Sequence, residues 1–325
     1  MTGRTPRPVA VTCGEPAGIG PEIMAHARRA LGADVPLFWI GDPSHLPADT
    51  EWQAIDAPAA AADVAAPVLP VLQHPFAKPV TPGLPELGNA ADVMAVIARA
   101  VALVTEGAAS ALCTAPIHKK VLKDGAGFPY PGHTEYLEAL TGAPQAVMML
   151  ASPELRVVPT TIHIPLRDVA EALTPTLLRH TIEITARDLR TRFGLPHPRI
   201  AVAGLNPHAG EGGTMGRAEV DWIADLVAQM AADGLDITGP WPGDTLFHAA
   251  ARQRYDVAVC MYHDQALIPI KTLDFDRGVN VTLGLPIVRT SPDHGTAFDI
   301  AGTGRANPTS MIEALRLAWQ MGGGA

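Results

Sequence analysis

The sequence is poor in aromatic residues and in positive charge, and each shortage excludes a class of protein. Aromatic residues make up 5% of the 325 residues, which favours α/β layers over an aromatic-rich β-sandwich. The formal net charge of -9 gives no basic field for a phosphate backbone, so we expect no nucleic-acid partner. A small anionic substrate stays possible, because a few Lys or Arg in one cleft can bind a phosphate.

Cysteines and long apolar runs are also scarce. Cys13, Cys113 and Cys260 each end a short apolar run and show no CxxC spacing, which predicts buried thiols in a reducing compartment. No uncharged apolar run approaches the ~18 residues that a membrane span needs. Residues 1–16 contain no apolar stretch long enough for a signal peptide. We therefore expect a soluble, cytoplasmic protein with no membrane partner.

What the chain does contain is a regular alternation of short apolar runs and amphipathic stretches. The runs are continuous, as in parallel strands covered on both faces. They predict strands at 7–13, 36–40, 109–115, 155–163, 199–205 and 256–262. Helices are predicted at 21–31, 90–106, 175–193, 216–233, 244–254 and 308–321, and the Ala- and Pro-rich segment 57–72 is predicted to be a surface excursion. This order favours an α/β fold with a mainly parallel sheet.

Three histidines lie at or just beyond the ends of predicted strands. His163 follows LRVVPTTI, His208 follows RIAVAGLNP and His263 follows DVAVCMY. Ligands of parallel α/β sheets bind outside the carboxyl ends of the strands. Three neutral imidazoles with an open fourth position form a catalytic divalent-metal site, for which nitrogen ligands favour Zn²⁺. The alternative is three unrelated loop histidines, because the chain has 12.

Two aspartates lie near these proposed site segments. Asp264 directly follows His263, and Asp244 opens the stretch DTLF. Either carboxylate could orient a metal ligand or act as a base. A helix N-cap is the alternative role for Asp244.

Two glycine-rich stretches are candidate nucleotide loops. GEPAGIGPE at 14–22 lacks the third glycine of GxGxxG and the GK[ST] of a P-loop, so a standard Rossmann fingerprint is absent. Its alternative role is a tight turn between strand and helix. DHGTAFDIAGTGRANP at 293–308 mixes small and polar residues in a way that can wrap an adenosine, or that can form an ordinary turn cluster.

Some residues are candidates for binding an anion: His133, Thr134, Lys271, Asn280 and Arg289. PGHTE at 131–135 opens a predicted helix, whose first N–H groups favour phosphate. Lys271 and Arg289 lie in apolar sequence, where a cation is costly unless it meets an anion. An internal salt bridge is the alternative for either cation. The basic run at 118–123 is expected on a solvated helix face.

Long motifs extend in register from about residue 8 to about residue 310: GEPAGIGPE, CTAPIHKK, GHTEYL, HIPLRD, GLNPHAGEGGTMG, DTLF, YHDQALIPIK and GVNVTLGLPIVRTSPDHGTAFDIAGTG. Together they resemble the 4-hydroxythreonine-4-phosphate dehydrogenase family of pyridoxal phosphate biosynthesis. The stretch at 293–308 is also similar to the cofactor loop of isopropylmalate and isocitrate dehydrogenases. That likeness implies two α/β/α-layered domains rather than a standard Rossmann fold.

The family resemblance implies a domain plan and a set of site residues. We expect one domain at 1–128 plus 281–325, a second at 129–280, and the active site in the cleft between them. The family's metal ligands fall on His163, His208 and His263, and its substrate contacts on the five anion-binding candidates. The wider relation implies NAD or NADP contacts at His294, Gly295, Ala297, Asp299 and Asn307. The family is also similar in forming homodimers with shared active sites.

The resemblance implies an oxidative decarboxylation. A divalent metal (Zn²⁺, Mg²⁺, Mn²⁺ or Co²⁺) would lower the pKa of the C3 hydroxyl of 4-hydroxythreonine 4-phosphate while hydride passes to NAD or NADP. Loss of CO₂ would give 3-amino-2-oxopropyl phosphate, with Asp244 or Asp264 as base. Alternative substrates are D-threonate or D-erythronate 4-phosphate, or a cyclic dihydrodiol. An alternative of another class is a non-catalytic metal- or phosphate-binding protein.

Overall fold

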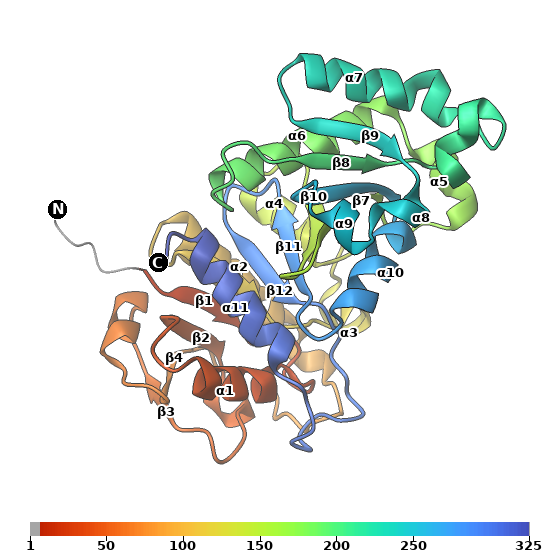
Figure 1. Cartoon of the computed structure of the whole chain (residues 1–325). Coiled ribbons are helices and arrows are strands. Elements are labelled where there is room, and N and C mark those ends of the chain that lie inside the picture. The colour runs from red at the N-terminus through yellow and green to blue at the C-terminus, as the bar shows by residue number, and fades with distance from the viewer. Residues whose placement is uncertain (1–6, 325) are drawn as a thin grey trace, which may run out of the picture. The chain divides into compact units, whose positions relative to one another are not determined.

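A computed structural model describes residues 7–324 of the chain, and Figure 1 shows its helices and strands. Residues 1–6, part of the N-terminal stretch that was searched for a signal peptide, lie outside the described residues. The chain divides into two compact units. Unit 1 contains Met1–Ala146 and Leu285–Ala325, and unit 2 contains Val147–Gly284. The second domain was expected at 129–280, whereas residues 129–146 group with unit 1 and residues 281–284 with unit 2.

Unit 1 is built on a parallel sheet with the strand order β3-β4-β2-β1-β5-β12. The strands are β1 (Val9–Thr12), β2 (Leu37–Gly41), β3 (Trp52–Ala54), β4 (Leu69–Gln73), β5 (Ala111–Thr114) and β12 (Arg289–Pro292). Every residue of β1, β2 and β5 is buried, so both faces of the sheet centre are covered, as the continuous apolar runs predict.

The helices of unit 1 lie on these faces. They are α1 (Gly20–Leu31), α2 (Ala90–Thr105), α3 (Lys119–Ala126), α4 (His133–Thr141) and α11 (Thr309–Met321). In Figure 1, α11 crosses in front of β1 and α2 lies behind the sheet. Helix α4, which lies after residue 129, contacts α2 of the same unit. The Tyr136 hydroxyl donates to the carbonyl of Met94 in α2 at 3.2 Å.

One prediction for unit 1 is partly wrong. The surface excursion predicted at 57–72 is wrong at its end, because β4 begins at Leu69 and pairs with β2 and β3 inside the sheet. Its prolines concealed the strand pattern.

The helical stretch Leu87–Thr105 is long and apolar enough to cross a membrane by length and composition. That is weak support for a span, since its Val93, Ile97 and Val101 are buried in the core.

Unit 2 has the strand order β11-β6-β7-β10-β8-β9. The strands are β6 (Val147–Ala151), β7 (Arg156–Thr161), β8 (Ile200–Ala203), β9 (Ile237–Trp241), β10 (Val257–Tyr262) and β11 (Val279–Leu283). β6 runs antiparallel to β11 and β7, and the other pairs are parallel. The mainly parallel α/β fold is therefore confirmed.

The helices of unit 2 correct two expectations. They are α5 (Val169–Ala172), α6 (Pro175–Thr191), α7 (Ala224–Ala232), α8 (Gly243–Leu246), α9 (Ala249–Arg252) and α10 (His263–Leu273). The single helix predicted at 244–254 is two short helices, and the one predicted at 216–233 includes a π-helix at Glu219–Ile223. Helix α10 was missed, because Pro269 lies inside it.

The three cysteines are free and buried as predicted, and burial raises the pKa of Cys113 to about 12.

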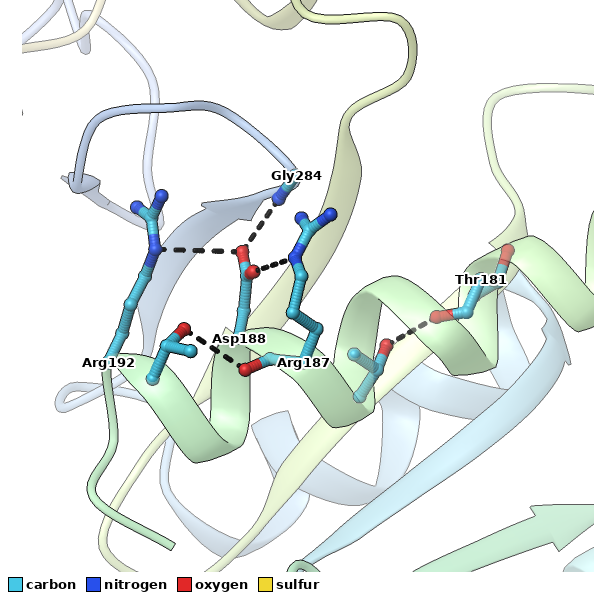
Figure 2. A network of polar contacts seen from close by, with 7 residues as sticks. Thr181, Arg187, Asp188, Arg192 and Gly284 are labelled. Carbon is cyan, nitrogen blue, oxygen red and sulfur yellow. Dashed lines mark hydrogen bonds and ion pairs between the residues drawn. The ribbon is translucent and has the colours of Figure 1, made fainter. Parts of the chain in front are cut away.

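A buried carboxylate fixes the end of β11 in unit 2. Asp188 on α6 is 1% exposed. Figure 2 shows its carboxylate between Arg187, Arg192 and the backbone of Gly284. It accepts a 2.9 Å hydrogen bond from Arg187 Nε and a 2.8 Å bond from the Gly284 N–H. Gly284 has a φ of +87°, which glycine adopts without strain, and the carboxylate accepts from its partly buried N–H.

Candidate active site

In unit 2, three histidines follow three neighbouring strands. β10 lies between β7 and β8 and is parallel to both, with Tyr262 opposite Thr161 and Val259 opposite Val202. The carboxyl ends of the three strands therefore meet at one edge of the sheet. His163, His208 and His263 lie just beyond that edge, where ligands of such sheets bind.

Two of the three rings lie next to each other. The ring centroids of His163 and His263 are 5.7 Å apart. Nδ1 of His263 lies 2.7 Å from Oδ1 of Asp264. A carboxylate can only accept here, so this contact assigns the proton of a neutral His263 to Nδ1 and leaves the Nε2 lone pair for a metal.

The third histidine belongs to a neighbouring cavity. His208 lines a cavity of about 530 Å³ together with Asp244, Tyr262, Asp264 and Gln265. Within residues 7–324, no group of three or more His, Cys, Asp or Glu side chains is close enough to hold a metal ion. The structure thus brings together His163 with His263, and His208 with both aspartates, but it does not gather the three rings. Their imidazole chemistry and neighbouring strand ends still fit a divalent ion.

Backbone strain marks the same positions. His163 and His208 have φ angles of +52° and +51°. Residues 208–213 all have positive φ, including Ala209 and Glu211. The left-handed conformation costs about 1–2 kcal/mol for each residue that is not glycine. Strain of this kind persists only where the surrounding structure imposes it, and it is concentrated at functional sites.

The two candidate bases differ in their contacts. The Asp264 carboxylate is engaged with His263. Asp244 lies in the first turn of α8, whose N-cap is Pro242, so Asp244 is not the N-cap. Among residues 7–324 its carboxylate has no hydrogen-bond or ion-pair partner, and it faces the cavity that His208 lines.

Unit 1 contains a buried cationic site around Arg289. The side chain is 4% exposed at the start of β12. Its Nη2 and Nε donate to the Thr114 hydroxyl at 2.6 and 3.1 Å, and Nη2 lies 3.5 Å from Nδ1 of His133. Burial lowers the pKa of Arg289 to about 10, so the guanidinium stays protonated at neutral pH.

His133 is neutral for a clear electrostatic reason. Burial, together with the positive charges of Arg289 and Lys119, holds its pKa well below 6.5. Because a guanidinium only donates, the contact with Arg289 assigns the acceptor role to Nδ1 and the ring proton to Nε2. Nε2 is buried and has no hydrogen-bond partner among the described residues. A buried N–H donor without a partner fits an oxyanion.

The N-terminus of α4 adds to this site. His133 and Thr134 are the first residues of the helix, after Gly132 as N-cap. A Cβ placed on Gly132 would lie 3.1 Å from Oε2 of Glu135 and 3.2 Å from Nζ of Lys119, so both side chains end close to this N-terminus. Thr114 and Lys119 were missed. Both lie in CTAPIHKK, where Lys119 is exposed, as the predicted solvated helix face requires, while its positive charge also acts on His133.

The remaining anion-binding candidates lie in unit 2. Lys271 is in the last turn of α10, with its ammonium 5.7 Å from the centroid of the Phe275 ring. Asn280 lies on β11 opposite Leu150. Both side chains are half-buried.

The two glycine-rich loops lie side by side in unit 1. The Ile19 N–H donates to the carbonyl of Thr296 at 3.0 Å. The buried carboxylate of Glu22 accepts from the N–H groups of Gly302 and Ala306 at 3.0 and 3.3 Å. A cavity of about 540 Å³ is lined by both loops, including Gly18, Glu22 and Gly302.

The predicted cofactor residues occupy the second loop. Gly295, Asp299 and Asn307 are exposed there, and Ala297 has a φ of +44°. His294 is half-buried, and burial lowers its pKa below 6.5. Asn307 Oδ1 also accepts from the N–H of Thr309 at 3.0 Å, at the start of α11. The loop reaches the 540 Å³ cavity through Gly302, Thr303 and Gly304, and the five predicted residues are not part of its lining.

Comparison with known proteins decides the family. Residues 30–318 match the model of the family described as pyridoxal phosphate biosynthetic protein PdxA. The chain belongs to this family. It is 66% identical to the 4-hydroxythreonine-4-phosphate dehydrogenase of Roseobacter denitrificans, with 97% of both chains covered. The chain is thus placed among the oxidoreductases of pyridoxal phosphate biosynthesis, and the resemblance found in the sequence is confirmed.

Solved structures agree with the PdxA family assignment. A crystal structure of 4-hydroxythreonine-4-phosphate dehydrogenase from Klebsiella pneumoniae matches with a TM-score of 0.90 and 41% identity, over 99% of both chains. A terephthalate 1,2-cis-dihydrodiol dehydrogenase from Burkholderia xenovorans matches with a TM-score of 0.67 and 24% identity, over 98% of this chain and 99% of that one. The second likeness concerns the fold alone.

Proposed function

We propose that the chain oxidises the C3 hydroxyl of 4-hydroxythreonine 4-phosphate, with NAD or NADP as hydride acceptor. The resulting β-keto acid would lose CO₂ and take up a proton to give 3-amino-2-oxopropyl phosphate. The observation that carries this proposal is the buried site in unit 1, where protonated Arg289 lies beside the unpartnered Nε2–H of His133. It is supported by the family to which the chain belongs.

The proposed phosphate-binding residues act together. Arg289 keeps its positive charge while buried, and Thr114 holds the guanidinium in place. The first N–H groups of α4 and the side chain of Thr134 would supply further donors to phosphate oxygens. His133 stays neutral, so its Nε2–H would donate a hydrogen bond without changing the charge of the site. In unit 2, Lys271 and Asn280 are proposed as further substrate-binding residues.

We further propose that His163, His208 and His263 hold one divalent ion, either Zn²⁺, Mg²⁺, Mn²⁺ or Co²⁺. When bound, such an ion supplies a Lewis acid that lowers the pKa of a substrate hydroxyl. Asp264 would orient His263 through Nδ1. That leaves Asp244 as the proposed base, since its carboxylate faces the cavity that His208 lines.

The loop at 293–308 is the proposed cofactor site, with contacts from His294, Gly295, Ala297, Asp299 and Asn307. Its hydrogen bonds to the loop at 14–22 hold both loops in place next to one cavity. Asp299 is exposed and would repel a 2′-phosphate if it faces the ribose, which favours NAD over NADP.

We also propose a cytoplasmic homodimer in which each active site uses both subunits. Unit 2 exposes large apolar side chains on and just after α10, with Ile268 62% and Phe275 73% exposed. Such side chains are typical of a covered face. The three buried free thiols suit a reducing compartment. The net charge of -9 disfavours a nucleic-acid partner.

The main alternative keeps the fold and changes the substrate. D-threonate and D-erythronate 4-phosphates carry the same phosphate, so the Arg289 site would bind them too. An unphosphorylated dihydrodiol has no phosphate to accept hydrogen bonds from the Nε2–H of His133 and the first N–H groups of α4. A non-catalytic binding protein would have no use for the cofactor loop, whose sequence is complete.

The decisive experiment follows NADH absorbance with purified protein and added divalent metal. 4-Hydroxythreonine 4-phosphate and threonate 4-phosphate are compared at equal concentrations. We expect a rate at least about tenfold higher with the amino substrate, which corresponds to 1.4 kcal/mol. A higher rate with threonate 4-phosphate would overturn the proposed substrate and move the enzyme to sugar-acid oxidation.

A further inference from the structure

The segment that follows β5 contacts both glycine-rich loops of unit 1. Strand β5 is buried throughout, and residues 115–118 lead from it into α3. The carbonyl of Pro116 accepts a 2.8 Å hydrogen bond from the N–H of Glu15 in the loop at 14–22. The ring of His118 lies against the ring of Phe298 in the loop at 293–308, with the ring centroids 5.1 Å apart. One short segment at the exit of a core strand therefore contacts both loops.

His118 is fixed at the start of α3. It is the N-cap of this helix, and its Nδ1 accepts a 3.4 Å hydrogen bond from the N–H of Val121. The carbonyl of His118 also accepts from the N–H of Leu122 at 3.1 Å. The planes of the His118 and Phe298 rings are inclined at 66°, which is close to the edge-to-face arrangement that ring pairs prefer. The helix end thus holds the imidazole in place, and the imidazole gives Phe298 a fixed surface to pack on.

The loop at 293–308 has backbone anchors on both sides of Phe298 and strain next to it. The carbonyl of Thr296 and the N–H of Gly302 are both hydrogen-bonded to the loop at 14–22. Between them, Ala297 has a φ of +44°, a left-handed conformation that is unfavourable for a residue with a Cβ. Such a conformation persists only where its surroundings impose it. The Phe298 carbonyl also packs closely on Gly83, where a Cβ would lie 2.9 Å from the carbonyl oxygen.

The place of the Phe298 ring restricts the residues on either side of it. Asp299 follows Phe298 directly and is exposed. Because the ring and the backbone of Phe298 share one Cα, the backbone cannot rotate far without moving the ring away from His118. The ring contact therefore restricts the segment 297–299, which carries two of the proposed cofactor contacts.

We propose that His118 is a positioning residue of the cofactor loop at 293–308. Its imidazole holds the ring of Phe298, and thereby holds Ala297 and Asp299 in the arrangement that binds the dinucleotide. His118 does not need to touch the dinucleotide. This inference rests on the proposed function, because it requires that NAD or NADP binds to this loop.

The test measures NADH and NADPH binding to the full-length protein by fluorescence titration, without substrate. His118→Asn removes the ring but keeps an acceptor for the N-terminus of α3, since Asn is a preferred N-cap. We expect its NADH affinity to be about 3- to 10-fold lower, which is the strength of one edge-to-face ring pair. His118→Phe keeps a ring but removes the acceptor. It should bind NADH as the wild type does, while its melting temperature falls by about 2–4 °C.

A matched control shows whether the loss of any such ring pair matters. His74 also lies edge-on to a phenylalanine of unit 1, with its ring centroid 5.9 Å from that of Phe76. His74→Asn should leave NADH affinity unchanged. Phe298→Leu should weaken NADH binding by a factor similar to that of His118→Asn. The double variant should bind no more weakly than Phe298→Leu alone, because the ring contact is already lost.

The outcomes separate this inference from the proposed function. If the wild type binds neither NADH nor NADPH, or if His294→Ala and Asp299→Ala both leave binding unchanged, the cofactor site itself is wrong and the inference fails with it. If those variants lose binding while folded His118→Asn keeps wild-type affinity, the cofactor loop stands and only the positioning role is overturned.

Two further results would also overturn the positioning role. Equal losses of NADH affinity in His118→Asn and His118→Phe would mean that the ring contact does not determine binding. Multiplying losses in the double variant with Phe298→Leu would mean that His118 does not act through Phe298. A loss in His118→Asn, wild-type affinity in His118→Phe and no added loss in the double variant support the role.

Discussion

The guanidinium of Arg289 lies 3.5 Å from Nδ1 of His133, and this contact determines how the imidazole can be used. Since a guanidinium has no acceptor, Nδ1 of His133 must direct its lone pair at Arg289. The proton of the neutral ring is therefore on Nε2. The same positive charge disfavours a second proton on the ring. The pair therefore offers a full positive charge and a neutral N–H donor in one buried place, which is a suitable environment for a dianionic phosphate.

Replacing the guanidinium should weaken use of the phosphorylated substrate. Arg289→Lys keeps a positive charge but loses the planar fork that donates twice to Thr114. We expect kcat/KM to fall by about a hundredfold, or roughly 3 kcal/mol, mainly through KM. Steady-state kinetics checks this, with Arg316→Lys as the matched control, because the Arg316 side chain on α11 is exposed. An unchanged kcat/KM in folded Arg289→Lys would rule out this side chain as the phosphate ligand.

The depressed pKa of His133 predicts a pH dependence of stability. The unfolded chain takes up a proton on this ring near pH 6.5, whereas the folded chain does so only at much lower pH. The unfolded state thus binds more protons below about pH 6.5. In that range the free energy of unfolding should decrease as the pH is lowered, by at most ~1.4 kcal/mol per pH unit from this group.

Urea unfolding between pH 7.5 and 5 measures that slope. His45, His74 and His294 also have lowered pKa values because of burial, so the comparison between variants isolates His133. His133→Gln should flatten the dependence, and exposed His197→Gln should not. Parallel curves for the wild type and His133→Gln would contradict the assignment.

The Asp188 network should contribute measurably to stability. Asp188→Asn removes the charge that faces Arg187 and Arg192 and weakens the acceptor for the Gly284 N–H (Figure 2). We expect a loss of about 1–3 kcal/mol in the free energy of unfolding, because the buried amide would present an N–H donor where the arginines also donate. Asp221→Asn, which removes an exposed 2.7 Å pair with Arg217, should cost less than ~1 kcal/mol. Equal losses in the two variants would show that burial of the Asp188 network adds nothing to the free energy of unfolding.

Two aspartates near the metal site should have separable effects. Asp264→Asn disturbs the partner of His263 Nδ1 and should weaken Zn²⁺ binding by about tenfold or more. Asp244→Asn should leave Zn²⁺ affinity unchanged but lower kcat by about 10²- to 10⁴-fold, as for loss of a general base. Calorimetry and initial rates on both variants distinguish the roles. A reversed pattern would assign the base to Asp264.

Local sequence patterns predicted much of the frame but not the contacts that complete the site. The continuous apolar runs located β7, β8 and β10, and so placed His163, His208 and His263 at one sheet edge. Helix α10 was missed because its Pro269 breaks the usual helical pattern. The three rings were expected to form one group, but the strained segment at 208–213 places His208 in the neighbouring cavity.

Contacts between distant positions leave no mark on a single sequence. The amide of Gln265 binds Gly204, which lies 61 positions away, and Arg289 binds Thr114 across 175 positions. Lys119 looked like any solvated lysine in a basic run, and only the fold brings its ammonium next to Gly132. Which distant residues become hydrogen-bond partners depends on the order of the strands in the sheet, and periodicity and spacing in the sequence do not predict that order.

The most direct test of the account is the metal dependence of substrate oxidation. The protein is freed of metal with a chelator, and NADH formation from 4-hydroxythreonine 4-phosphate is recorded before and after adding Zn²⁺, Mg²⁺, Mn²⁺ or Co²⁺. The account predicts a negligible rate without metal, restored by at least one ion in the wild type but not in His263→Ala. A full rate in the metal-free protein, or equal restoration in His263→Ala, would contradict it.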